Sequence, residues 1–141
     1  KMIREIFIKN KDKMKDHLVI FQSVNSPGTI EKQFINDLKK NGIKCGYVTA
    51  FRSDWSYEEF ISKKNKITLA ATDSSTLEKV KFIFDFFDME YLVIEDIFEA
   101  EIFENAKLSL ELIIQTFINQ LSFAFPSANI TKISKQLVEH L

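Results

Sequence analysis

Four short apolar runs, separated by longer amphipathic stretches, dominate the pattern of this chain. The runs occupy residues 18–21, 43–51, 67–71 and 91–94. A short uninterrupted apolar run is typical of a strand that is covered on both faces of a sheet. Because the stretches between the runs have helical spacing, the pattern predicts a three-layer α/β/α fold. Its central sheet should be mostly parallel, as in RecA-like and Rossmann-like proteins.

A helix should follow the first apolar run. Ser26 suits the N-cap position because its hydroxyl can accept a hydrogen bond from the first helical turn. Pro27 would then occupy the first helical position. Apolar residues recur at the spacing of one helix face: Ile30, Phe34 and Leu38. Gly42 suits the left-handed residue that ends the helix, so the first two strands should form a parallel βαβ unit.

The loop between the first strand and this helix is a candidate anion site. In a βα unit, backbone N–H groups point at whatever lies over the helix N-terminus. Small polar residues fill the loop, as in a phosphate-binding loop: Ser23, Asn25, Ser26, Gly28 and Thr29. The same residue types serve any turn and helix cap, so a plain structural loop is the alternative.

The remaining segments predict further helices. Residues 2–8 are either an edge strand or a short helix, and a short helix should begin near Ser56. Residues 74–87 predict a very apolar helix, and residues 108–125 predict a long one that Pro126 ends. After Pro126, the spacing of Ile130, Ile133 and Leu137 predicts an amphipathic helix. A strand over residues 128–133 is the alternative.

Five acidic residues follow the fourth apolar run: Glu95, Asp96, Glu99, Glu101 and Glu104. Asp96 stands where a Mg²⁺-coordinating carboxylate would stand in a phosphate-handling site. A solvated acidic loop is the alternative, and it is favoured because no Lys-Ser/Thr pair in the first loop supports a metal. No Cys/His cluster is present, so we do not expect a zinc site.

Length and charge narrow the class of protein. A chain of 141 residues predicts one domain over residues 1–141, with an α/β core at 17–100 and a C-terminal helical segment at 105–141. A net charge of −1 gives no sign of nucleic-acid or anionic-membrane binding. No apolar run approaches the roughly 20 residues of a transmembrane helix. The single Cys45 predicts an inert buried thiol in a reducing, cytoplasmic compartment.

Several apolar residues lie off the main helical stripes: Phe82, Phe86, Leu112, Ile118 and Phe123. A soluble protein rarely leaves such surface uncovered. We therefore expect a protein partner or a homodimer.

The order of elements resembles the RecA-fold ATPases of the KaiC type. Residues 21–35, Phe-Gln-Ser-Val-Asn-Ser-Pro-Gly-Thr-Ile-Glu-Lys-Gln-Phe-Ile, resemble the family's phosphate loop and following helix. Residues 41–51 are similar to its second strand, and residues 91–96, Tyr-Leu-Val-Ile-Glu-Asp, to its Walker B strand. The resemblance covers roughly residues 17–100.

The chain departs from that family at the positions of its chemistry. Ile30 and Glu31 stand where the family has Gly-Lys, and Lys32 is out of register. Phe51 and Arg52 replace the acidic pair that polarises water in the family. The resemblance therefore implies a non-catalytic regulatory or protein-interaction domain, of the kind found in prokaryotic sensory systems, and the assignment leans away from an enzyme.

A flavodoxin-like domain is the alternative to this assignment. The loop at residues 23–29 loosely resembles a flavin-phosphate loop, with Ser and Thr residues and one Gly. On that interpretation the loop would bind a nucleotide or FMN. The leading interpretation expects no cofactor.

Overall fold

The computed structural model of the protein describes residues 2–15, 17–48 and 67–140. These residues form two compact units, which comprise residues 1–105 and 106–141. The sequence-based expectation of one domain over the whole chain stays a prediction.

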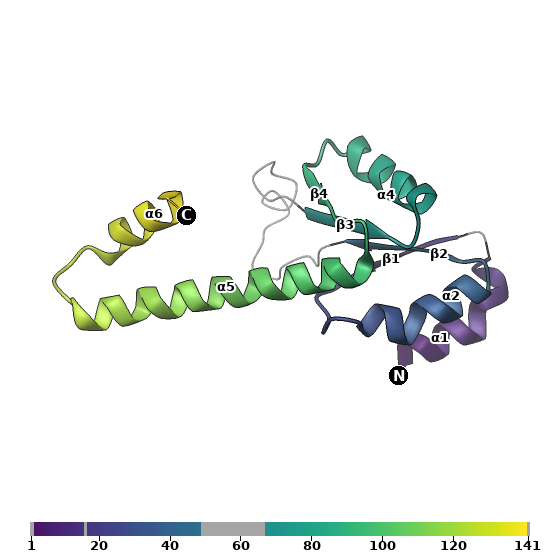
Figure 1. The fold of residues 1–141 in the computed structure, drawn as a ribbon, viewed down its shortest axis with the longest axis horizontal. Coiled ribbons are helices and arrows are strands. Elements are labelled where there is room, and N and C mark those ends of the chain that lie inside the picture. The colour runs from purple at the N-terminus through teal and green to yellow at the C-terminus, as the bar shows by residue number, and fades with distance from the viewer. Residues whose placement is uncertain (1, 16, 49–66, 141) are drawn as a thin grey trace. The chain divides into compact units, whose positions relative to one another are not determined.

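The described residues of the first unit form four strands and the helices that cover them (Figure 1). Its elements are α1 (Met2–Asn10), η1 (Lys11–Lys13), β1 (Leu18–Gln22), η2 (Glu31–Ile35), α2 (Asn36–Lys40), β2 (Lys44–Val48), β3 (Ile67–Ala71), α4 (Ser74–Phe86), β4 (Tyr91–Val93) and the first turns of α5 (Ile97–Ala124). The four strands match the four predicted apolar runs. Residues 2–8 form a helix and not an edge strand. The helix predicted near Ser56 and the end of the second predicted strand lie outside the described residues.

The four strands form one sheet in the order β1-β2-β3-β4. β1 and β2 are parallel, as the predicted βαβ unit requires, and β3 and β4 are also parallel. β2 and β3 are antiparallel, with Tyr47 opposite Ala70. The prediction of a mostly parallel sheet in an α/β fold is therefore confirmed, with one reversal at the centre of the sheet.

Helices cover both faces of this sheet (Figure 1). One face lies under α1, η2, α2 and the start of α5, and its buried residues form one cluster: Ile30, Ile35, Leu38, Ile43, Cys45, Tyr47, Ala70, Ile97 and Ala100. The other face lies under α4, with a second buried cluster: Val48, Ile67, Leu69, Val80 and Met89. Side chains of β1 contribute to both clusters. Both faces are buried, which explains why the strands are continuous apolar runs.

Three phenylalanines attach α1 to the sheet. The ring centroid of Phe7 lies 6.0 Å from that of Phe21 and 5.9 Å from that of Phe34. Phe21 and Phe34 lie 4.9 Å apart. These tilted and edge-to-face contacts join α1, β1 and η2 in one aromatic cluster.

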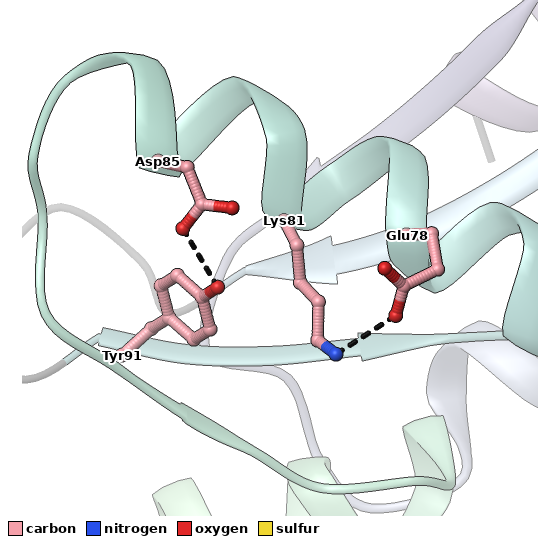
Figure 2. A network of polar contacts seen from close by, with 4 residues as sticks. All are labelled: Glu78, Lys81, Asp85 and Tyr91. Carbon is pink, nitrogen blue, oxygen red and sulfur yellow. Dashed lines mark hydrogen bonds and ion pairs between the residues drawn. The ribbon is translucent and has the colours of Figure 1, made fainter.

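Side chains of α4 and β4 form polar contacts at the surface (Figure 2). Lys81 Nζ lies 2.8 Å from Glu78 Oε1, and the Tyr91 hydroxyl donates to Asp85 Oδ1 over 2.8 Å. The hydrogen bond to Asp85 raises the pKa of Tyr91. These groups are largely exposed, so the pairs stabilise the unit only slightly. The Tyr91–Asp85 hydrogen bond connects the end of α4 to the edge strand β4.

The second unit consists of the remainder of α5 and α6 (Ile130–His140). The helical alternative for the last segment is therefore confirmed. Large apolar side chains are exposed in this unit: Leu108, Leu110, Leu112, Ile113, Phe117, Phe123, Phe125, Ile133 and Leu137. Within the described ranges, no helix is both long enough and apolar enough to cross a membrane.

Gly46 allows β2 to pack closely against α4. A Cβ atom at this position would lie 2.7 Å from Val80 Cγ2, and Val80 is fully buried. We expect Gly46→Ala to lower the free energy of unfolding by about 1–3 kcal/mol, because the core must shift to accept the methyl group. Urea denaturation measures this change.

The double variant Gly46→Ala, Val80→Ala is the control for this explanation. Its loss of unfolding free energy should be smaller than the sum of the losses in the two single variants. The reason is that Val80→Ala shortens the side chain and leaves room for the new methyl group. Strict additivity would rule out the proposed contact as the cause.

Candidate functional site

The loop after β1 binds a carboxylate of the protein itself. Glu101 lies in the second turn of α5 and is fully buried. Its Oε2 accepts a hydrogen bond of 2.7 Å from the Gly28 amide, and its Oε1 accepts one of 3.1 Å from the Ile30 amide. The carboxylate therefore occupies the position over the helix N-terminus where the sequence predicted a candidate site for an external anion.

Local geometry explains why these amides are available. Gly28 has a φ of +81°, a left-handed conformation that favours glycine. The chain turns there and enters a continuous helix over residues 29–40 that contains the π-helical segment η2. The first amides of a helix have no intrahelical acceptor. Glu101 supplies one from 73 residues along the chain.

The helix begins later than the sequence predicted. Ser26 was expected to cap it through its hydroxyl, but no side chain of the loop caps η2. Instead the Ser26 carbonyl accepts hydrogen bonds from the Thr29 amide and the Thr29 hydroxyl. The N-cap prediction for Ser26 was wrong because a distant carboxylate performs the capping. Gly42, with a φ of +68°, ends the helix as predicted.

The predicted loop residues lie together, and most of their polar groups are engaged within the protein. Asn25 Nδ2 contacts Ser23 Oγ at 2.5 Å, and the Asn25 carbonyl accepts a hydrogen bond of 2.6 Å from Asn105 Nδ2. Asn105 also lies on α5, one turn after Glu101. Two residues of α5 thus bind the loop through its backbone. Whether Ser23, Asn25, Ser26, Gly28 and Thr29 contact a ligand stays a prediction.

More buried polar groups lie beside Glu101. Thr68 of β3 donates to Glu104 Oε1 over 2.5 Å, and both side chains are buried. The hydroxyl of Tyr47, on β2, is buried without a hydrogen-bond partner. Burial raises the pKa of Tyr47, and the charges of Glu104 and Glu101 act in the same direction. The start of α5 therefore places two carboxylates against the middle of the sheet.

Burial also raises the pKa of Glu101 above its ordinary value of 4.5. The amide hydrogen bonds from Ile30 and Gly28 lower it, and the charge of Glu31 raises it. Desolvation of the carboxylate is the largest of these effects. Cys45 is buried as predicted, and burial raises the pKa of its thiol to about 12.

The role of Glu101 was not predicted, because the acidic residues were interpreted as a loop. Residues 97–104 are instead the first turns of α5, which begins eleven residues before the predicted start. The favoured interpretation, a solvated acidic loop, was wrong for Glu101 and Glu104. A signal was present: Ile97, Ala100, Glu101 and Glu104 have the spacing of one helix face, and all four are buried.

Asp96 caps α5. Its Oδ1 accepts hydrogen bonds from the amides of Phe98, at 2.8 Å, and Glu99, at 3.1 Å. Asp73 caps α4 in the same manner, and hydrogen bonds from Thr76 lower the pKa of Asp73. Among the described residues, no group of three or more His, Cys, Asp or Glu side chains could hold a metal ion. The role of Asp96 as a metal ligand stays a prediction.

These two capping residues line a cavity of about 330 Å³ at the carboxyl ends of β3 and β4. Its other lining residues come mainly from η2, α2 and the starts of α4 and α5: Glu31, Ile35, Lys39, Ala71, Thr72, Ser74, Leu77, Glu95, Ile97 and Phe98. Four carboxylates and one lysine face this cavity. Such a lining opposes the binding of a phosphate or diphosphate group.

The glycines also bear on nucleotide binding. Dinucleotide-binding domains hold the pyrophosphate with a Gly-x-Gly-x-x-Gly turn before a helix. The three glycines of this chain are Gly28, Gly42 and Gly46, so they cannot form that turn. The chain therefore lacks the glycine turn, and the amides of Gly28 and Ile30 after β1 are bound to Glu101.

Comparison with known proteins identifies the fold. No protein-family profile and no curated protein matches the chain. Solved structures do match, and one is GDP-mannose dehydrogenase from Pseudomonas aeruginosa, in a ternary complex. It has a TM-score of 0.77 and 16% identity, over 98% of this chain and 34% of that one.

Two archaeal enzymes agree with this match. UDP-glucose dehydrogenase from Pyrobaculum islandicum has a TM-score of 0.69 and 22% identity, over 84% of this chain and 28% of that one. UDP-D-ManNAc dehydrogenase from Pyrococcus horikoshii has a TM-score of 0.72 and 12% identity, over 94% and 34%. The chain has the Rossmann-like α/β fold of these nucleotide sugar dehydrogenases and spans about a third of their length.

These matches correct the family resemblance drawn from the sequence. The similar solved structures are nucleotide sugar dehydrogenases and not RecA or KaiC ATPases, so the resemblance and the regulatory role that it implied were wrong. The flavodoxin-like alternative is not supported either. The Pro-Gly-Thr turn was misleading because it belongs to a loop that binds a carboxylate of α5, and not to a phosphate loop.

Removal of the Glu101 carboxylate should destabilise the first unit. Glu101→Ala leaves two buried amides without an acceptor, and each unsatisfied amide costs about 1–3 kcal/mol. We expect a loss on the order of 2–6 kcal/mol in chemical denaturation. Glu99→Ala, on the same helix but exposed, is the matched control and should cost about 1 kcal/mol or less. Equal losses in the two variants would contradict a special role for Glu101.

The raised pKa of Glu101 also predicts a pH dependence. The folded protein holds the Glu101 proton more tightly than the unfolded chain does. The stability due to this group is therefore fully present below the unfolded pKa of about 4.5, and it is lost as pH rises through the folded pKa. As pH rises through that range, the unfolding free energy of wild type should fall relative to that of Glu101→Gln. A difference that stays constant with pH would contradict the prediction.

Proposed function

We propose that this chain is a scaffold module of a nucleotide sugar dehydrogenase-like protein. The observation that carries the proposal is the match to GDP-mannose dehydrogenase over 98% of this chain at a TM-score of 0.77. Because the identity is 16%, the match supports a shared architecture, and the activity is our inference from it.

The substrate class follows from the names of the three similar enzymes. Each acts on a sugar joined to a nucleoside diphosphate: GDP-mannose, UDP-glucose or UDP-D-ManNAc. We infer that the complete protein to which this module contributes oxidises a sugar of this class. Oxidation of a sugar alcohol requires a hydride acceptor, for which a nicotinamide dinucleotide is the usual cofactor.

The residues of this chain do not fit a dinucleotide. The glycine turn is missing, the amides of Gly28 and Ile30 are bound to Glu101, and the cavity near β3 and β4 is lined by carboxylates. The dinucleotide and the sugar nucleotide should therefore be bound by other parts of the assembly. The role that we assign to this chain is to build four strands of the α/β unit and to fix the start of α5.

A cytoplasmic location forms part of this proposal. Cys45 is a free, buried thiol, which is typical of a protein from a reducing compartment. The proposal also requires a polypeptide that supplies the missing nucleotide-binding groups, either within a longer form of this chain or as a partner.

The test compares two preparations in the presence of NAD⁺ or NADP⁺ and a sugar nucleotide. One is the 141-residue chain, and the other is native protein captured from its source with antibodies to the chain, with all co-purifying polypeptides. Each receives UDP-glucose, GDP-mannose or UDP-D-ManNAc, and reduced cofactor is followed by absorbance. We expect turnover by the native preparation and none by the 141-residue chain. Turnover by the chain alone would refute the scaffold role, and an inactive native preparation would refute the enzyme class.

A further inference from the structure

The turn after α2 contains the one Asn-Gly pair of the chain, at Asn41 and Gly42. In such a pair the backbone nitrogen of the glycine can attack the side-chain amide carbon of the asparagine, because the glycine has no Cβ atom to hinder the approach. Asparagine is a thermolabile residue type for this reason. Asn41 is half-buried and Gly42 is exposed, so water reaches the pair. The pair is therefore a candidate site of spontaneous chemical modification.

The reaction available to this pair is deamidation, with water as its co-reactant. A bond forms between Gly42 N and Asn41 Cγ, the bond from Cγ to Nδ2 breaks, and ammonia leaves with the proton of the Gly42 amide. The product is a cyclic imide. Water then opens the imide at one of its two carbonyl carbons. The result is either an aspartate in place of Asn41 or an isoaspartate, in which the main chain runs through Cβ and Cγ.

A Schellman motif holds the pair in the folded protein. The Gly42 amide donates to the Lys39 carbonyl over 3.1 Å, and the Ile43 amide donates to the Leu38 carbonyl over 3.0 Å. These are the two backbone hydrogen bonds of the motif, and the φ of +68° at Gly42 is the left-handed conformation that it requires. Leu38 and Ile43 belong to the same buried cluster. The turn is therefore fixed both by hydrogen bonds and by packing.

These contacts oppose deamidation at both reacting groups. Asn41 Nδ2 donates to the Asp37 carbonyl over 2.6 Å, which holds the side chain against the preceding turn of the helix. The Gly42 amide is held in the other direction by the Lys39 carbonyl. Ring closure requires the Gly42 nitrogen to approach Asn41 Cγ in an aligned geometry. Both hydrogen bonds must therefore open before the reaction can begin.

We propose that Asn41–Gly42 is a deamidation site that the folded helix end protects, and that its modification weakens this helix end. The reaction takes place in the fraction of molecules in which the last helical turn has opened. An aspartate lacks the amide that donates to the Asp37 carbonyl, and it adds a negative charge at the negative end of the helix dipole. An isoaspartate adds a methylene group to the main chain inside the Schellman motif, so both of its hydrogen bonds lose their register.

Peptide mapping by mass spectrometry tests the site. The 141-residue chain is incubated at mildly alkaline pH, either folded or unfolded in guanidinium chloride. We expect Asn41 to deamidate in both samples, and roughly tenfold or more slowly in the folded one, because two hydrogen bonds must open first. Asn36 is the internal control: it is exposed on the same helix but precedes Asp37, so it should keep its amide far longer. Equal rates in the two samples, or an Asn41 that stays intact in the unfolded chain, would overturn the proposal.

Two variants of Lys40 test whether the helix end is the gate. Lys40 is exposed in the last turn of α2. Lys40→Gly loosens this turn, whereas Lys40→Ala removes the same charge and keeps a good helix former. In the folded state we expect Asn41 to deamidate up to about fivefold faster in Lys40→Gly than in Lys40→Ala, with equal rates when both chains are unfolded. Equal rates in the two folded variants would exclude the helix end as the gate.

Hydrogen exchange of the Gly42 and Ile43 amides tests the consequence of the modification. Asn41→Asp reproduces one product, and Asn41→Ala is the matched control, because it removes the same donor without adding a charge. After correction for intrinsic rates, both variants should exchange faster than wild type, and Asn41→Asp faster than Asn41→Ala. Salt should reduce the difference between the two variants. Wild-type exchange in Asn41→Asp would show that the modification leaves the helix end intact and would refute this part of the proposal.

Discussion

A single carboxylate joins the two ends of the first unit. Glu101 binds the amides of Gly28 and Ile30, so the loop after β1 and the start of α5 hold each other in place. The amide hydrogen bonds at the helix N-terminus offset part of the cost of burying the carboxylate, and desolvation remains the larger effect. Asn105 strengthens the same connection through the Asn25 carbonyl. These hydrogen bonds, together with the buried Ile97 and Ala100, connect the start of α5 to the rest of the first unit.

The consequence for function is that the loop cannot be judged from its sequence alone. Small polar residues after an apolar strand are compatible with phosphate binding, with flavin binding or with a plain turn. What distinguishes these cases is the group that faces the amides, and here that group comes from a residue 73 positions away. The chain shares its fold with dehydrogenases. That similarity is therefore no evidence that this loop binds a cofactor.

Local patterns predicted much of the fold. The apolar runs at β1, β3 and β4, the parallel pairing of β1 with β2, and the end of the helix at Gly42 are consequences of short-range chemistry, and each was predicted. The reversal between β2 and β3 could not be predicted, since an apolar strand has the same pattern in either direction. The start of α5 was missed because Glu101 and Glu104 look like surface residues until their buried partners are known. The candidate loop was located correctly, but its internal occupant was not predicted.

The most direct test of this account is an NMR titration of the Gly28 and Ile30 amide protons. The account predicts that both protons shift together as pH is raised, with a common midpoint above 4.5, because both donate to the Glu101 carboxylate. The shared transition should disappear in Glu101→Gln. Amide protons that do not respond to pH, or that respond equally in the variant, would contradict the account.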